Sequence, residues 1–121
     1  MINYNITKLD ISSRKLTKLP DNIDEYTNLI ELDCCFNEIT SLDNLPPTLR
    51  ILYCHWNKIT SLDNLPTTLK LLYCTNNEIT SLDNLPSKLE VLICHENLLI
   101  YDFESTLENI RNYNTSRILS S

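Results

Sequence analysis

The fold of this chain is decided by a 20-residue unit, residues 49–68, which reads LRILYCHWNKITSLDNLPTT. The flanking units, residues 29–48 (LIELDCCFNEITSLDNLPPT) and 69–88 (LKLLYCTNNEITSLDNLPSK), keep its leucines, asparagine and proline. A shortened copy, LEVLICHENLLIYDF, begins at Leu89, and a diverged copy, ITKLDISSRKLTKLP, begins at Ile6. Self-similarity at a fixed period of about 20–50 residues is typical of solenoids. The sequence therefore predicts a repeat solenoid of about five stacked turns.

Each unit opens with L-x-x-L-x-C, whose fourth and sixth residues lie on one side of a short strand because strand side chains alternate. One such strand cannot bury its apolar side alone, whereas stacked copies form a parallel sheet over a continuous core. The core positions predicted in this way are Leu9, Ile11, Leu32, Cys34, Leu52, Cys54, Leu72, Cys74, Leu92 and Cys94. From the returning segments, we expect Leu42, Leu45, Leu62, Leu65, Leu82 and Leu85 to pack against them.

An asparagine follows four of these strands, at Asn37, Asn57, Asn77 and Asn97. A short amide side chain can hydrogen-bond the backbone of a turn, so stacked copies should form a ladder. Asparagine also tolerates left-handed backbone, and we expect it to supply that conformation in a chain with no glycine. The first repeat has Arg14 at this position, which predicts a looser turn at that end.

The full pattern L-x-x-L-x-C-x-x-N-x-I resembles the leucine-rich-repeat consensus over residues 6–103. The 20-residue period and the proline-containing tail are most similar to the short repeats of bacterial type III effectors. The use of cysteine for leucine also resembles repeat proteins of giant DNA viruses. This resemblance implies an α/β solenoid with a short parallel sheet on its concave face and a largely irregular convex face. It also implies a binding scaffold, although a fold alone does not define a function.

We expect one leucine-rich-repeat domain over residues 1–121. Its predicted parts are repeats at about 6–28, 29–48, 49–68, 69–88 and 89–103, followed by a C-terminal cap at 104–121. In the cap, Ser105-Thr106-Leu107-Glu108 matches a capping box that would open a short helix. Side chains expected to cover the last repeat are Leu107 and Ile110, with Ile118 and Leu119 as further candidates. Only Met1, Ile2 and Tyr4 are available to shield the first repeat.

Charge and hydropathy exclude several kinds of partner. The formal net charge is −6 and the basic residues are scattered, so we expect no binding to nucleic acid or to an anionic membrane surface. No stretch approaches the roughly 18 apolar residues of a membrane helix. The N-terminus lacks a basic region followed by an apolar run, which predicts a cytoplasmic location. If the viral resemblance holds, that location is the host cytoplasm or the virion.

Four cysteines recur every 20 residues, and they could form a metal ladder, a chain of disulfides or a buried column. We favour the buried column, because parallel neighbours lie about 4.8 Å apart whereas disulfides need Cβ atoms about 3.8 Å apart. Cys35 is expected on the outer side, either as an accessible thiol or as an unreactive surface cysteine. No zinc-binding pattern of converging ligands is present.

The remaining polar residues offer no recognisable catalytic motif. His55 and His95 are two repeats apart, about 10 Å, which is too far to share a metal ion. Asp43, Asp63 and Asp83 could hold a cation, but we expect each to cap backbone N–H groups in its own turn. We therefore predict a non-enzymatic protein with no cofactor and no metal.

The concave face has the strongest sequence signal for function. A solvent-facing sheet surface should be mostly polar, yet this face combines apolar and aromatic residues with a few charges. The predicted binding residues are Asp33, Phe36, Ile51, Tyr53, His55, Trp56, Leu71, Tyr73, Val91, Ile93 and His95. Such patches usually mark an interface, although strand propensity alone could also select these residue types.

The function predicted from this face is protein–protein interaction, with another protein or with a second copy of the chain as the partner. Two alternatives stay open. One is a structural, virion or decoy element built from repeats, and the less favoured one is a small enzyme.

Overall fold

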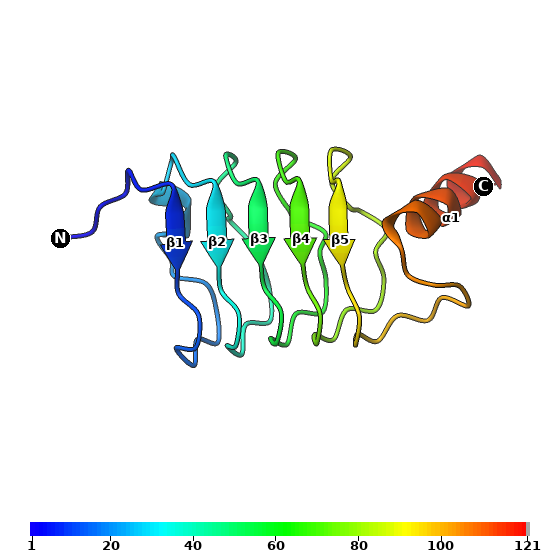
Figure 1. Ribbon diagram of the computed structural model, residues 1–121, viewed down its shortest axis with the longest axis horizontal. Helices are drawn as coiled ribbons and strands as arrows, with labels where there is room; N and C mark the ends of the chain where they lie inside the picture. The colour runs from blue at the N-terminus through cyan, green and yellow to red at the C-terminus, as the bar shows by residue number, and fades with distance from the viewer. Residues whose placement is uncertain (121) are drawn as a thin grey trace.

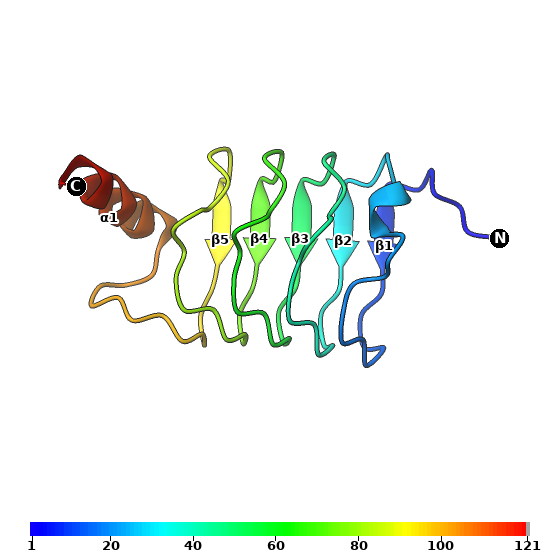
Figure 2. The ribbon, with the colours of Figure 1, turned by 180° about the vertical axis from the view of Figure 1, so that it is seen from behind.

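The structure, a computed structural model, describes residues 1–120. Its elements in chain order are β1 (Lys8–Asp10), the 3-10 helix η1 (Ile23–Glu25), β2 (Glu31–Asp33), β3 (Ile51–Tyr53), β4 (Leu71–Tyr73), β5 (Val91–Ile93) and α1 (Leu107–Ser120). The strands form one parallel sheet in sequential order, and the connecting segments return behind it (Figures 1 and 2). The predicted leucine-rich-repeat solenoid is confirmed, with five strands joined by four complete turns.

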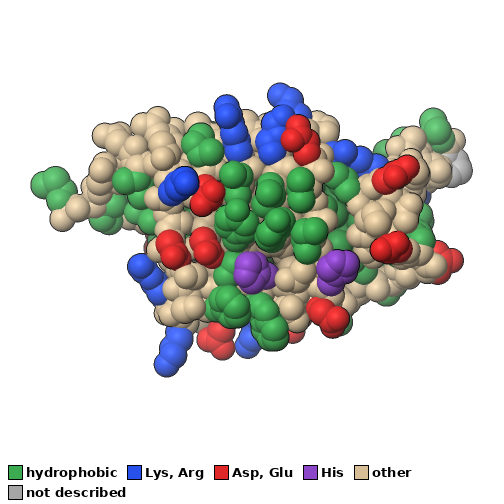
Figure 3. All heavy atoms as spheres, in the orientation of Figure 1, with side chains coloured by type: hydrophobic (Ala, Val, Ile, Leu, Met, Phe, Trp, Pro, Cys, Tyr) green, Lys and Arg blue, Asp and Glu red, His purple; other side chains and the backbone are tan. Residues whose placement is uncertain are grey.

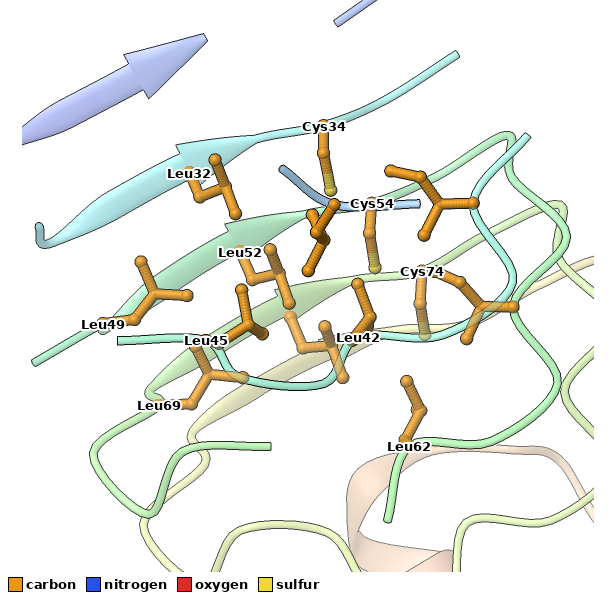
Figure 4. Close-up of a cluster of buried hydrophobic side chains, with 14 of the residues drawn as sticks. Leu32, Cys34, Leu42, Leu45, Leu49, Leu52, Cys54, Leu62, Leu69 and Cys74 are labelled. Atoms are coloured by element: carbon orange, nitrogen blue, oxygen red, sulfur yellow. The ribbon is translucent and has the colours of Figure 1, made fainter. Parts of the chain in front are cut away.

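The 20-residue period of the sequence is also the register of the sheet. Leu52 of β3 pairs with Leu72 of β4, and Tyr53 pairs with Tyr73. In β2–β5, the central leucine of the strand points into the core beside the cysteine that follows the strand, as Figure 4 shows for Leu52 and Cys54. Both side chains are fully buried. The sequence therefore predicted most of the core correctly, because alternation along a strand and repetition between strands fix the same positions. Leu9, Leu65 and Leu85 are only partly buried and pack against this core.

The predicted asparagine ladder is present. The Nδ2 group of Asn57 donates to the carbonyl oxygens of Cys34 (3.0 Å) and Cys54 (3.1 Å), and its Oδ1 accepts from the N–H of Ile39 (3.0 Å). Asn77 repeats this pattern one turn further along. Each asparagine thus joins the backbone of its own turn to the turn before it, and it satisfies polar groups that would otherwise be buried without partners.

The left-handed backbone lies one residue earlier than predicted. In each repeat that has a ladder asparagine, the residue before it has a positive φ of 57°: Phe36, Trp56, Asn76 and Glu96. In the first repeat, Ser13 and Lys15 on either side of Arg14 have φ of 56° and 57°. The prediction that the ladder asparagines supply this conformation is therefore wrong. Their amide groups must point into the solenoid to reach three backbone partners, and the reversal of the chain takes place at the exposed residue before them.

The C-terminal cap forms a helix, but its details differ from the prediction. The helix begins at Leu107, and Thr106 caps it by accepting the N–H of Asn109 at 3.1 Å, one residue later than the predicted capping box. Ile110 is fully buried, as expected. The expectation for Ile118 and Leu119 is wrong, because they are 71% and 80% exposed. These two residues lie at the end of α1 that projects away from the solenoid (Figure 1).

Polar side chains fasten α1 to the last repeats. The guanidinium of Arg111 donates to the carbonyl oxygens of Ser87 (3.1 Å) and Leu89 (2.6 Å). Asn114 donates to the carbonyl oxygen of Leu82 at 3.0 Å. The cap therefore supplies hydrogen-bond donors at the point where the next repeat would otherwise supply them.

The N-terminal end of the solenoid is thinly covered, as expected. Tyr4 packs edge-on against Tyr26 at 4.9 Å between ring centroids, and its hydroxyl accepts from the Asn22 amide at 2.7 Å. Met1 is fully exposed and Ile2 is about half exposed, so they contribute little to this cover.

Candidate functional site

The face of the sheet opposite the core presents two lines of side chains. The first residues of β2–β5 form one line, Glu31, Ile51, Leu71 and Val91, and the third residues form the other, Asp33, Tyr53, Tyr73 and Ile93. We call these eight residues the strand face. All of them are half-buried or exposed, whereas the leucine between them in each strand is buried. Seven of the eleven predicted binding residues therefore lie together on one surface, and whether they bind a partner stays a prediction.

The character of the strand face changes along the solenoid. Glu31 and Asp33 make it acidic at β2, and from β3 onward it is aliphatic and aromatic. In Figure 3, apolar side chains gather over the middle of the sheet, with both histidines and acidic side chains at their border. A polar rim around an apolar centre is the usual anatomy of a protein interface.

Two tyrosines occupy the centre of the strand face. The rings of Tyr53 and Tyr73 meet edge-to-face at 5.2 Å between centroids. Burial raises the pKa of the Tyr53 hydroxyl above its ordinary value, and the negative charge of Glu31 raises that pKa further. The hydroxyl therefore stays protonated at neutral pH and can donate a hydrogen bond to a partner. Edge-to-face packing also restricts both rings in advance, which reduces the entropy lost when a partner binds.

A second aromatic group lies just beyond the strand ends. Phe36 and Trp56, which we call the aromatic pair, are stacked with 6.2 Å between ring centroids and 13° between ring planes. They are 54% and 53% exposed, and both have left-handed backbone. The edge of Phe36 also meets the ring of His55 at 5.5 Å. The structure thus places the predicted residues Phe36, His55 and Trp56 beside one another.

Cys35 is buried beneath this group, which contradicts the expectation of an outer thiol. Only 2% of the residue is exposed, and its sulfur lies 3.1 Å from Nδ1 of His55. The prediction was wrong because β2 ends at Asp33, so side chains no longer alternate at Cys35. Burial raises the pKa of the Cys35 thiol, and the Asp33 carboxylate raises it further. A protonated, buried thiol is a poor nucleophile, so the Cys35–His55 contact is structural.

The other four cysteines form the predicted buried column, and all five thiols are free. Burial raises the pKa of Cys34 to about 12, and it also raises the pKa values of Cys54, Cys74 and Cys94. Within residues 1–120, no three His, Cys, Asp or Glu side chains come together in a way that could hold a metal ion.

His95 takes no part in the group around Cys35. It is exposed at the far end of the face, two repeats from His55 and separated from it by Thr75.

The aspartate ladder on the outer turns has a different role from the predicted one. Asp43 accepts a hydrogen bond from the Asn64 amide of the next repeat, and Asp63 accepts one from Asn84, both at 3.0 Å. Asp83 is bound instead by the Arg117 guanidinium of α1 at 3.1 Å. The expected capping of backbone N–H groups in each turn is therefore wrong, because the carboxylates bridge neighbouring repeats. The Asn64 bond, followed by the Ser41 hydroxyl, lowers the pKa of Asp43.

A hollow between the last repeat and α1 was not predicted. Its volume is about 390 Å³, and its lining includes Tyr101, Phe103, Tyr113 and Arg117. The three rings pack on one another at 4.8–5.7 Å between centroids, and Arg117 lies over the Tyr113 ring at 5.4 Å. Because these contacts join the last repeat to α1, we assign the residues around the hollow to the docking of the cap. The Tyr101-x-Phe103 pair was its only signal in the sequence.

No helix in residues 1–120 is both long enough and apolar enough to cross a membrane.

Comparisons with known proteins agree with this architecture. No protein-family model matches the chain, and no curated protein matches it. Among solved structures, the chain is similar to the leucine-rich-repeat (LRR) domain of a Shigella effector, with 29% sequence identity and a TM-score of 0.58. The match covers 80% of this chain and 52% of that one, so the chain spans about half the length of the effector domain. This supports the predicted resemblance to bacterial effector repeats. No comparison supports the resemblance to viral repeat proteins.

Proposed function

We propose that this chain is a protein-interaction module that binds a protein partner through the strand face and the aromatic pair. The observation that carries the proposal is the exposed group of apolar and aromatic side chains around Tyr53 and Tyr73, with the aromatic pair just beyond the strand ends, on a side of the sheet that packs against no other described element. Isolated surface hydrophobic residues are common, but contiguous patches of this kind usually mark interfaces. Tyrosine and tryptophan are also the residues most enriched among the strongest contributors to binding.

The leucine-rich-repeat architecture supports an interaction role in general, and the charges of the strand face indicate the character of the partner. Glu31 and Asp33 lie directly before the aromatic centre. A segment that fits this surface has a basic residue at one end and apolar residues along the rest. Complementary charge of this kind sets orientation and speeds association more than it raises affinity.

The test is a comparison of variants of the tagged chain. The double substitution Tyr53→Ala/Tyr73→Ala should abolish capture of a partner protein, because it removes the central anchors. The matched double substitution Lys58→Ala/Glu78→Ala changes exposed residues of the same two repeats away from the strand face, and it should leave capture unchanged. Any captured protein is then purified, and its affinity for each variant is measured by calorimetry. Equal affinity for the tyrosine variant and the unaltered chain would refute the proposal.

Trp56→Asn is a variant whose loss of binding would not be explained by a folding defect. The next repeat has Asn76 at the equivalent position, with the same φ of 57°, so the backbone accepts asparagine there. We expect unchanged or slightly higher thermal stability together with at least about tenfold weaker binding, since buried aromatic anchors contribute about 2 kcal/mol or more.

A further inference from the structure

The first strand of the sheet has an open edge. The Thr7 carbonyl oxygen accepts the N–H of Glu31 (3.0 Å), and the Ile11 N–H donates to the Asp33 carbonyl oxygen (2.8 Å). Because alternate residues of a strand direct their N–H and C=O groups to opposite sides, those of Lys8 and Asp10 point away from β2. On that side, no strand formed by residues 1–120 pairs with β1. These two residues therefore direct their backbone donors and acceptors toward the open edge, where the Asp10 carbonyl oxygen already accepts one bond from Arg14.

Apolar groups at this end are also incompletely covered. Leu9 is only partly buried, whereas its counterparts Leu32, Leu52 and Leu72 are fully buried. The first residues of the chain leave β1 and project past its edge (Figure 1), with Met1 and Ile2 exposed. The end of the core is therefore less completely covered than its middle, and the exposed residues Met1 and Ile2 lie beside it.

The charges of β1 select among the strands that could pair with it. Lys8 and Asp10 have opposite charges and lie on the same side of the strand. Parallel pairing with β5 of another copy would place them against the apolar Val91 and Ile93. Parallel pairing of two β1 strands would place each charge against an identical one. Antiparallel pairing about Leu9 places Lys8 of each copy opposite Asp10 of the other. The dimer then contains two Lys8–Asp10 pairs of opposite charge.

The backbone geometry agrees with this antiparallel register. In an antiparallel pair, directly opposed residues alternate between those that exchange N–H···O bonds and those that do not. Lys8 and Asp10 direct their backbone groups to the open edge and would form the hydrogen-bonded pairs. Leu9, whose groups face β2, would lie opposite Leu9 of the second copy in a pair without hydrogen bonds, on the two-fold axis of the dimer. The guanidinium of Arg14 reaches the Asp10 carbonyl oxygen at 3.2 Å. A carbonyl oxygen has two lone pairs, so it can accept a second donor.

We propose that two copies of this chain associate through their β1 edges, in an antiparallel pair held by reciprocal Lys8–Asp10 contacts. The Ser12 hydroxyl (2.6 Å) and N–H (2.9 Å) both donate to the Asp10 carboxylate, so it is oriented at the edge before the copies meet. A two-fold contact is closed, and the product is therefore a dimer rather than a filament. Three-residue strands give a small contact, and the dimer is expected to form at high micromolar concentrations.

The test uses charge reversal followed by sedimentation equilibrium over a range of concentrations. Lys8→Asp and Asp10→Lys each create two like-charge pairs in the dimer, and each should raise its dissociation constant at least about tenfold. An equimolar mixture of the two variants should form a heterodimer, because two acidic side chains of one then face two lysines of the other. Weakening by each single reversal combined with rescue by mixing indicates the antiparallel register, because in a parallel β1 pair the unaltered chain would already place each charge against an identical one.

Matched controls separate this edge from other surfaces. Lys58→Asp makes the same change in net charge at an exposed position away from β1, and it should leave the dimer unchanged. Ser12→Ala removes the hydroxyl bond to Asp10 without changing charge and keeps the backbone N–H bond. It measures how much this orienting bond contributes, and we expect it to weaken the dimer less than Asp10→Lys does. Tyr53→Ala/Tyr73→Ala should also leave the dimer unchanged, so the dimer and the proposed partner site can fail independently. The proposal is overturned if the unaltered chain stays monomeric at all concentrations. It is also overturned if the charge reversals do not weaken the dimer, or if their mixture does not associate.

Discussion

Asn57→Ala should strongly destabilise the fold, although it removes only a small polar side chain. Asn57 is buried and joins two turns through hydrogen bonds to Ile39, Cys34 and Cys54. After truncation, the Cys34 and Cys54 carbonyl oxygens keep bonds from Asn37 and Asn77, but the Ile39 N–H loses its partner.

The size of the effect follows from these contacts. A buried N–H without a partner costs about 1–3 kcal/mol, and each of the two lost carbonyl bonds contributes about 0.5–1.5 kcal/mol. The free energy of unfolding should therefore fall by about 2–6 kcal/mol, a large share of the roughly 5–15 kcal/mol of a typical domain.

Denaturant titration followed by far-ultraviolet circular dichroism and Trp56 fluorescence measures this loss. Asn64→Ala is the matched control, because Asn64 is exposed and its amide makes one bond, to the Asp43 carboxylate. Its effect should stay within about 0.5 kcal/mol, as for most surface substitutions. If the two substitutions destabilise the protein equally, the inter-repeat asparagine ladder is not a principal source of stability.

Two further predictions concern titratable groups. All five thiols should react with a thiol reagent only as fast as the native protein unfolds, because they are buried and burial raises their pKa values; rapid labelling of any one, read by mass spectrometry, would contradict the structure. The pKa of Asp63, measured by NMR, should lie below its ordinary value and rise in Asn84→Ala, since the Asn84 amide is the main group that lowers it. A lowered folded pKa adds stability above the unfolded value that is lost as the pH falls through the folded value, and an unchanged pKa in the variant would count against the Asp63–Asn84 bond.

The repeat pattern was sufficient to predict the parts of the fold that depend on local periodicity. Alternation within a strand places Leu52 in the core and Tyr53 on the opposite face, and the 20-residue period extends that assignment to every repeat. The strand face could therefore be predicted almost completely.

The predictions that were wrong concern positions that neither alternation along a strand nor the 20-residue period determines. Cys35 lies beyond the end of β2, so alternation along the strand no longer decides where its side chain points. The bond between Asp43 and Asn64 joins two repeats, and it depends on how their exposed turns are offset in space. The docking of α1 depends on Arg111 and Arg117, whose long side chains find partners that no periodicity specifies.

The left-handed position before each ladder asparagine gives an independent reason to regard the aromatic pair as functional. Left-handed backbone is costly for any residue with a Cβ atom, and asparagine tolerates it better than bulky aromatic residues do. Asn76 takes the same φ of 57°, so the turn has no structural need for a large ring. Phe36 and Trp56 nevertheless occupy it with both rings about half exposed, and their only ring contacts within residues 1–120 are with each other and with His55. Strained backbone conformations cluster at binding and active sites, so we expect the aromatic pair to contribute more to binding a partner than to stability.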